Sequence, residues 1–239
     1  MNILKFNKSY FNIRVFYLLC NIFGKDKTNR ILFHFKKAHI LRTGMLFIHI
    51  PKSAGTSITN VLYGRRIGHF SLEQYKQYLG KDYKDVIYTF TVVRNPITRI
   101  YSAWKFARIG GTEEGAVNNY KKYQQDLFDT FDSFILNWLQ YQDLNTCEIL
   151  FRPQCNFLNL SKEENYNEVD IFYFENLSEL EAKLTIKTSK EIVFPNKNVV
   201  GDKINITKFD PKTIEKICEL YACDFKRFGY SIPEIFTKE

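Results

Sequence analysis

A short polar loop between an apolar run and a helix-compatible segment contains the residues best suited to chemistry. The run from Met45 to Ile50 is apolar without a helical period, and Pro51 and the loop Lys52-Ser53-Ala54-Gly55-Thr56-Ser57 follow it. This order predicts a strand, a loop and a helix. Small residues let backbone N–H groups converge on an anion, and Thr56 and Ser57 add hydroxyls where the helix dipole is positive. With the positive charge of Lys52, the loop predicts a phosphate site. It is not a Walker A motif, because GxxxxGK[ST] places its lysine after the last glycine.

A second polar segment follows the next predicted strand. Asp85 to Val93 is rich in β-branched and aromatic residues and runs directly into Arg94-Asn95-Pro96. Proline suits the first turn of a helix. On that helix Ser102 would lie two turns beyond Arg94, so a guanidinium and a hydroxyl could hold one phosphate together.

Together, HIPKSAGTS and VVRNPITRIYSAW resemble a known pair of nucleotide-binding motifs. The pair is that of carbohydrate sulfotransferases that use 3′-phosphoadenosine 5′-phosphosulfate (PAPS), in the branch of the heparan-sulfate 2-O-sulfotransferases and their bacterial relatives. The resemblance implies that the first motif holds the 5′-phosphosulfate and the second the 3′-phosphate. The matching positions are Lys52, Gly55, Thr56 and Ser57 in the first motif, with Ser53 and Ala54 in the same loop, and Arg94 and Ser102 in the second.

A histidine follows the first predicted helix. Sulfuryl transfer to a sugar hydroxyl requires a base, and histidine suits that task near neutral pH. His69 lies in a polar connection, where the resemblance also implies a catalytic histidine. We therefore predict His69 as the base, with Glu73 as the reserve candidate; a surface or capping histidine is the alternative. His49 lies inside the apolar run and is predicted to be a hydrogen-bonded core histidine.

Three further segments extend the resemblance, which covers Met45 to Tyr230 in patches. An RPQ stretch implies that Arg152 and Gln154 bind acidic or hydroxylated sugar groups, with a structural role as the alternative. A Pro-Asn-Lys-Asn loop implies that Lys197 meets a phosphate of the nucleotide. The third segment is the end of a closing helix predicted over Asp210 to Tyr230.

The order of elements predicts the fold class. Strands alternate with helices, and Val169 to Phe174 supplies a third strand, after which Glu175 and Asn176 are interpreted as helix-start capping. We predict an α/β three-layer fold with a central parallel sheet flanked by helices, and a ligand at the carboxyl ends of the strands. The resemblance implies that this architecture is P-loop-kinase-like. The sulfotransferase domain is predicted over residues 44–239, and residues 1–43 form a basic, aromatic, helical appendage.

Composition limits the class of protein. The 239 residues are 45% apolar, enough for a sizeable core, and the net charge of +8 favours anionic partners. Five cysteines without CxxC spacing are interpreted as reduced thiols, and no metal site is predicted. The apolar patch from Tyr10 to Phe23 is short of the ~20 residues that span a bilayer. Because animal members of the resembling family carry an N-terminal membrane anchor, the resemblance then implies a cytoplasmic enzyme of bacterial type. The patch is expected to pack on the domain or to touch a membrane peripherally.

The predicted reaction is in-line transfer of a sulfuryl group from PAPS to a carbohydrate hydroxyl. His69 would remove the proton, and Lys52 with the loop amides would stabilise the departing phosphate. The acceptor could be acidic or lipid-linked, and no nucleic-acid partner is expected. One alternative is a nucleotide kinase or NTPase of the same architecture, which is disfavoured because the loop has no GK[ST] sequence. The other is a non-catalytic polyanion-binding or glycan-binding protein.

Overall fold

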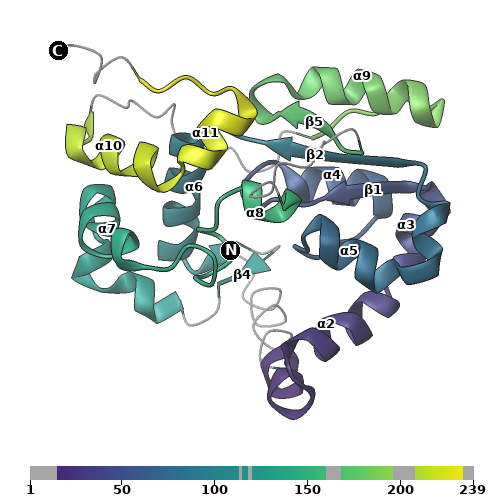
Figure 1. The fold of residues 1–239 in the computed structure, drawn as a ribbon, viewed down its shortest axis with the longest axis horizontal. Helices are drawn as coiled ribbons and strands as arrows, with labels where there is room; N and C mark the ends of the chain where they lie inside the picture. Colours follow the sequence, from purple (N-terminus) through teal and green to yellow (C-terminus); the bar gives the residue numbers. More distant parts are fainter. Residues whose placement is uncertain (1–14, 113–114, 118–119, 160–167, 196–207, 234–239) are drawn as a thin grey trace.

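The computed structural model describes residues 15–112, 115–117, 120–159, 168–195 and 208–233. Its central element is a parallel sheet in the order β1-β2-β5, formed by β1 (Met45–Ile48), β2 (Tyr88–Val93) and β5 (Asp170–Tyr173) (Figure 1). Met45 lies opposite Tyr88, and Val93 lies opposite Tyr173. The predicted α/β class with a central parallel sheet flanked by helices is confirmed.

The three predicted strands are present, and each is shorter than its apolar run. Every residue of β1 and β2 is buried, as expected for strands covered on both faces. β5 lies at one edge of the sheet, and only Phe172 within it is fully buried. Because β1 ends at Ile48, His49 and Ile50 leave the ladder and lead directly into the loop.

Helices surround the sheet and connect its strands (Figure 1). The helix α4 (Gly55–Tyr63) follows β1, and the Tyr63 hydroxyl fixes it there by donating to Met45 O (2.9 Å) and accepting from Phe47 N (3.0 Å). The other helices in the described residues, besides a segment over 15–23, are α2 (Lys25–His34), α3 (Lys37–Thr43), α5 (Leu72–Leu79), α6 (Pro96–Arg108), α7 (Phe131–Asn137), α8 (Cys155–Leu158), α9 (Leu177–Thr188), α10 (Pro211–Leu220) and α11 (Ala222–Phe228).

The closing helix predicted over Asp210 to Tyr230 is two helices. α10 ends at Leu220, Tyr221 has backbone dihedrals that are not helical, and α11 begins at Ala222. The Tyr221 side chain is fully buried, and its hydroxyl donates to Phe151 O. This tertiary bond fixes Tyr221 at the break between the two helices.

Two apolar cores stabilise the domain. One surrounds the sheet and includes Phe47, Phe90 and Phe172. The other joins α6 to α7 and α10, with Trp104 and Phe134 among its members. Because α6 starts at the carboxyl end of β2 and supplies the second core, it connects the two cores at the edge of the sheet where a ligand was predicted.

Candidate functional site

The loop after β1 has an unusual backbone. Lys52 has φ 70° and Ala54 has φ 59°, so two residues with side chains occupy the left-handed region just before α4 begins at Gly55. Such a conformation costs ~1–3 kcal/mol per residue, and residues that adopt it cluster at functional sites. Alternating right- and left-handed residues also turn successive N–H groups toward one point, which forms an anion-binding concavity.

The interior of this loop is closely packed yet retains an unused donor. A Cβ at Gly55 would lie 1.8 Å from two atoms of the His49 ring, so only glycine fits there. Ser53 is fully buried, and its hydroxyl has no hydrogen-bond partner among the described residues. A buried, unpaired hydroxyl beside a helix N-terminus is the group that an anion would satisfy.

Arg94 joins the second motif to the first. Its Nη1 donates to Lys52 O (3.2 Å), and its Nε donates to Thr98 Oγ1 (3.1 Å). Asn95 caps α6 by accepting from Ile97 N, as Pro96 at the helix start predicts. The contact between Arg94 and Lys52 O brings the two sequence motifs into one site at the carboxyl ends of β1 and β2.

Both cations of this site lie against aromatic rings. Lys52 Nζ lies 4.0 Å from the ring centroid of Phe106, and the Arg94 guanidinium lies 4.1 Å from that of Phe174. Burial, followed by the charges of Arg94 and Arg66, lowers the pKa of Lys52 to about 8. Burial also lowers the pKa of Arg94 to about 10. Because burial penalises their charged forms, an arriving anion would be strongly stabilised between them.

Gln154 fixes the backbone of Arg94. Its Oε1 accepts from Arg94 N (2.9 Å), its Nε2 donates to Arg94 O (2.8 Å), and its side chain is fully buried. The carboxylate of Asp224, also fully buried, accepts from Gln154 N and Cys155 N, both at 2.9 Å. Both ends of the Gln154 amide are used by Arg94, so these contacts favour the structural role over the predicted contact with an acceptor.

His69 lies beside this site, against His49. Its Nδ1 is 3.0 Å from His49 O, and the two ring centroids are 4.0 Å apart. A carbonyl oxygen only accepts, so the neutral His69 ring carries its proton on Nδ1 and a lone pair on Nε2. Burial and then the charge of Arg66 lower the pKa of His69 to about 4, so its ring is neutral at pH 7.

His49 is buried, as the sequence predicted, but its hydrogen bonding differs from the prediction. It stacks on Phe47, and its Nδ1 has no partner among the described residues. Burial, with the nearby His69, lowers the pKa of His49 well below its ordinary value. The ring is therefore neutral, and it packs between Gly55 and the His69 ring.

The other predicted site residues have varied surroundings. Ser102 is half-buried on α6, and Ser57 donates to Pro195 O (3.3 Å), which brings the segment before Lys197 to the first motif. Lys197 itself is outside the described residues. Glu73 Oε2 accepts from Asn159 (2.7 Å), and Arg152 donates to the carbonyls of Thr146 and Cys147, so part of its guanidinium is used within the fold.

Sequence reasoning missed several supporting groups. Glu175 was interpreted as helix capping, but its carboxylate accepts from Asn95 N (2.9 Å) and from the Tyr230 hydroxyl (3.0 Å). Phe106, Phe174 and Asp224 were not assigned to the site. Only Asp224 had a signal in the sequence, because it lies in the C-terminal segment of the resemblance.

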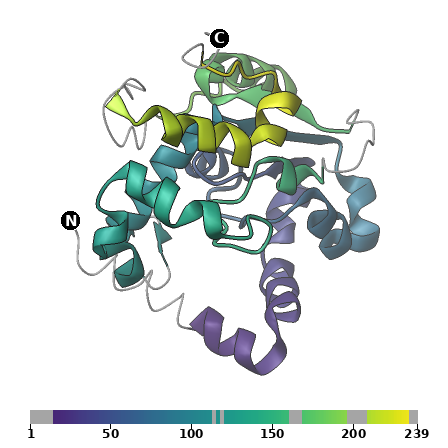
Figure 2. The same cartoon turned by 60° about the vertical axis from the view of Figure 1, so that its left-hand side comes forward.

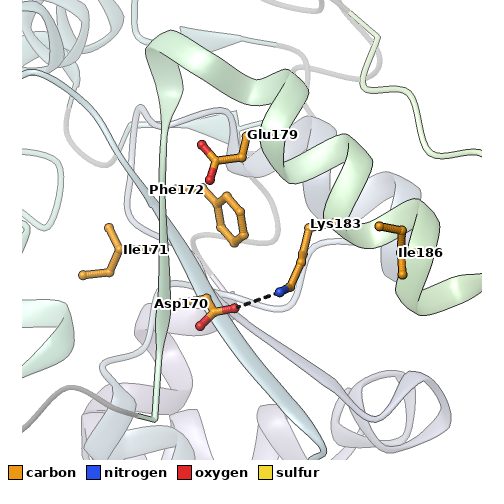
Figure 3. A pocket seen from close by; sticks show the side chains of 6 residues that line it. All are labelled: Asp170, Ile171, Phe172, Glu179, Lys183 and Ile186. Carbon is orange, nitrogen blue, oxygen red and sulfur yellow. Dashed lines mark ion pairs between the residues drawn. The ribbon is translucent and has the colours of Figure 1, made fainter.

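A shallow depression of about 320 Å³ lies elsewhere, between β5 and α9 (Figure 3). Lys183 Nζ is 4.0 Å from Asp170 Oδ2 across it, and Ile171, Phe172, Glu179 and Ile186 complete the lining. Asp170 is the first residue of β5, so this depression is at the opposite end of the strands from Lys52 and Arg94. It has no connection with the candidate site.

Comparison with known families decides the relationship. The model of the sulfotransferase family matches residues 41–231, which include both motifs, His69 and Asp224. This chain belongs to the sulfotransferase family. Comparison of this sulfotransferase with curated proteins and with solved structures gives no match. Its family transfers sulfuryl groups and generally uses PAPS as the donor, which agrees with an anion site built from two cations and a helix N-terminus.

Two kinds of feature are absent from the described residues. No group of three or more metal-ligating side chains occurs in the part of this sulfotransferase that the structure describes. Among the same residues, no helix combines the length and the apolar character needed to cross a bilayer.

Proposed function

We propose that this sulfotransferase transfers a sulfuryl group from PAPS to a hydroxyl of a carbohydrate acceptor. The observation that carries the proposal is the contact between Arg94 and the Lys52 carbonyl, because it makes one site of the two motifs. The unpaired Ser53 hydroxyl beside the N-terminus of α4 fits a bound phosphosulfate. A donor with one phosphate at each end of a ribose requires two neighbouring anion sites, and the two motifs supply them.

The proposed mechanism assigns one task to each group. Arg94 and Ser102 hold the 3′-phosphate, and the loop amides with Lys52, Thr56 and Ser57 hold the 5′-phosphosulfate. His69 Nε2 takes the proton of the acceptor hydroxyl as the new oxygen–sulfur bond forms. The bond between sulfur and the bridging phosphate oxygen breaks, and Lys52 stabilises the charge that develops on that oxygen.

The low pKa of His69 agrees with this task in one respect. Its lone pair is available throughout the neutral range, since the ring is not protonated there. An incoming anionic donor would raise this pKa, because it offsets the positive charges of Arg66 and Lys52 that help to lower it. The base is therefore strengthened when the donor is bound.

A reducing compartment suits the chain, and we propose a cytoplasmic location. What supports it is that all five cysteines are free thiols in the structure. The acceptor class rests on the family resemblance and on a base placed beside the donor site. Capsular polysaccharide, lipid-linked oligosaccharide and small glycosides are all chemically compatible acceptors.

Calorimetric titration with adenosine 3′,5′-bisphosphate, the desulfated product, tests the proposal. We expect binding that does not require magnesium. Arg94→Ala should weaken this binding by ~100-fold, because it removes the proposed charged contact between the guanidinium and the 3′-phosphate. Arg42→Ala, an exposed arginine on α3, is the matched control and should bind normally.

The same titration with ATP and magnesium separates the alternatives. Preference for ATP would favour a kinase or NTPase. Bisphosphate binding that does not depend on Arg94 would contradict the two-motif site and favour a general polyanion-binding protein.

A further inference from the structure

The net charge of this chain is confined to its first 43 residues. Residues 1–43 contain nine lysines and arginines and one acidic residue, whereas residues 44–239 contain 25 of each sign. The net charge of +8 therefore belongs entirely to the N-terminal segment, and the rest of the chain is neutral overall. Such asymmetry indicates that the segment, not the domain, meets an anionic partner.

The same segment exposes large apolar side chains. Seven of the 14 exposed large hydrophobics of the described chain lie between residues 15 and 35. Leu18 (60%), Ile22 (62%) and Phe35 (71%) are the most exposed of them. Clustered exposed apolar residues in a soluble domain mark an interaction surface.

The helix α2 divides these properties between two faces. Its inner face holds Phe33, which is 1% exposed and packs edge-on against Phe70 and Tyr75. Its outer face presents Ile31 with Lys27 four residues before it, and both are exposed. An apolar centre next to basic residues, on a helix whose other face is fixed to the body, is the pattern of an interfacial helix.

In the described part of the chain, this segment lies at the margin of the molecule. Residues 15–34 project from the lower edge of the molecule in both Figure 1 and Figure 2. The one acidic residue of the segment, Asp26, lies within this projection and is held by Tyr78, whose hydroxyl donates to it at 2.7 Å, and by Arg30 at 3.8 Å. Residues 15–34 therefore hold Lys25, Lys27 and Arg30 against this single acid, which leaves an excess of basic charge on the projecting helices.

We propose that residues 15–35 form a membrane-docking face whose partner is the surface of an anionic lipid bilayer. The basic residues meet the lipid headgroups, and the exposed apolar side chains insert at the boundary with the acyl chains. A nucleic acid or an acidic polysaccharide would use the charge but would leave the apolar side chains in water. The combination therefore favours a bilayer. This inference goes beyond the proposed reaction and does not depend on it.

Co-sedimentation of the full chain with lipid vesicles tests the inference. We expect binding to phosphatidylcholine vesicles that contain phosphatidylglycerol, and little binding to phosphatidylcholine alone. Replacing three apolar residues (Ile22→Ser, Ile31→Ser, Phe35→Ser), or reversing two charges (Lys25→Glu, Lys27→Glu), should each weaken binding by at least ~10-fold. Each of these side chains is exposed, so the folded domain does not need them.

Matched controls change the same residue types on the neutral body. Ile87→Ser with Ile186→Ser removes two isoleucines that are 79% and 77% exposed, and Lys190→Glu with Lys212→Glu reverses two exposed charges. Both controls should bind vesicles like the unchanged chain. Absence of binding to anionic vesicles would overturn the inference. A second result would also overturn it: vesicle binding that is lost only in the charge-reversed variant, together with equally strong binding of the unchanged chain to a soluble polyanion. The partner would then be a polyanion and not a bilayer.

Discussion

At the scale of single residues, the site is defined by two partly buried positive charges that are in place before any anion arrives. Lys52 and Arg94 both have lowered pKa values, and each is stacked on an aromatic ring. Holding like charges together costs stability in the empty protein. That cost is offset when a doubly anionic ligand binds, so the arrangement stabilises the complex more than the free chain.

The pH dependence of kcat/KM follows from two of these residues. His69 must be neutral to accept a proton, and its pKa of about 4 predicts a loss of activity below that pH. Lys52 must be charged, and its pKa of about 8 predicts a loss above that pH. The expected profile of kcat/KM for the free enzyme is a plateau between these limits.

Two variants assign the limbs of this profile. Lys52→Arg should move the alkaline limit upward, because a guanidinium stays charged to a higher pH than an ammonium group in the same surroundings. His69→Ala should lower the plateau by ~100-fold or more and remove the acid limit. An alkaline limit that stays in place in Lys52→Arg would show that another group causes it.

At the scale of elements, a chain of hydrogen bonds that starts on the C-terminal helix α11 supports the second motif. Asp224 on α11 binds the backbone at the start of α8, and Gln154 immediately before α8 holds the backbone of Arg94. The position of the guanidinium thus depends on segments 60 and 70 residues apart, as the hydrogen bonds show. The C-terminal segment of the resemblance acquires a physical role as the support of this chain of contacts.

Replacing Gln154 should act selectively on the 3′-phosphate. In Gln154→Ala, Arg94 loses both backbone contacts, each worth ~1 kcal/mol, and binding of adenosine 3′,5′-bisphosphate should weaken by ~10-fold or more. Binding of adenosine 5′-monophosphate, which lacks the 3′-phosphate, should change little. Calorimetry with both ligands measures this, and Gln77→Ala, an exposed glutamine on α5, is the control.

An equal loss for both ligands would indicate general damage to the fold and would contradict the positioning role. If Arg94→Ala discriminates between the ligands and Gln154→Ala does not, only the role of Gln154 is lost. If neither variant discriminates, the assignment of the second motif to the 3′-phosphate is lost as well.

At the scale of the whole molecule, the site lies where the two cores meet. The loop of β1 and α4 belongs to the core around the sheet, whereas most buried apolar residues of α6 belong to the helical core. A ligand held by both motifs therefore links the two cores. The two proposed tasks belong to different parts of the chain. Donor binding would use the neutral domain, and membrane docking would use the basic projecting helices, so donor binding requires no charge from residues 15–35.

Ligand binding should accordingly stabilise the domain as one unit. At a concentration of adenosine 3′,5′-bisphosphate of 100 times its Kd, the free energy of unfolding should rise by ~2.7 kcal/mol. Urea unfolding followed by both tryptophan fluorescence and circular dichroism should show one shared transition that moves to higher urea. Two transitions, of which only one moves, would show that the ligand contacts a single core.

The comparison of sequence and structure separates local from long-range information. The Lys52 loop, the Asn95-Pro96 helix start and the buried strands followed from residue types and spacing, because each depends on neighbours within a few positions. The two motifs of the family resemblance follow β1 and β2, the first two of the predicted strands. These features can be predicted from the sequence because turn chemistry and hydrophobic periodicity depend on residues close together in the chain.

Tertiary structure alone decided how these parts are held. Gln154 was assigned to an acceptor, but contacts with Arg94 and Asp224 bury it and use its amide. The packing of His49 between Gly55 and His69 likewise depends on tertiary contacts between these residues. A glutamine or histidine has the same local pattern whether its partner is water, a ligand or a distant backbone group. Only the fold selects that partner, because the hydrogen bond joins groups whose separation in sequence carries no periodic signal.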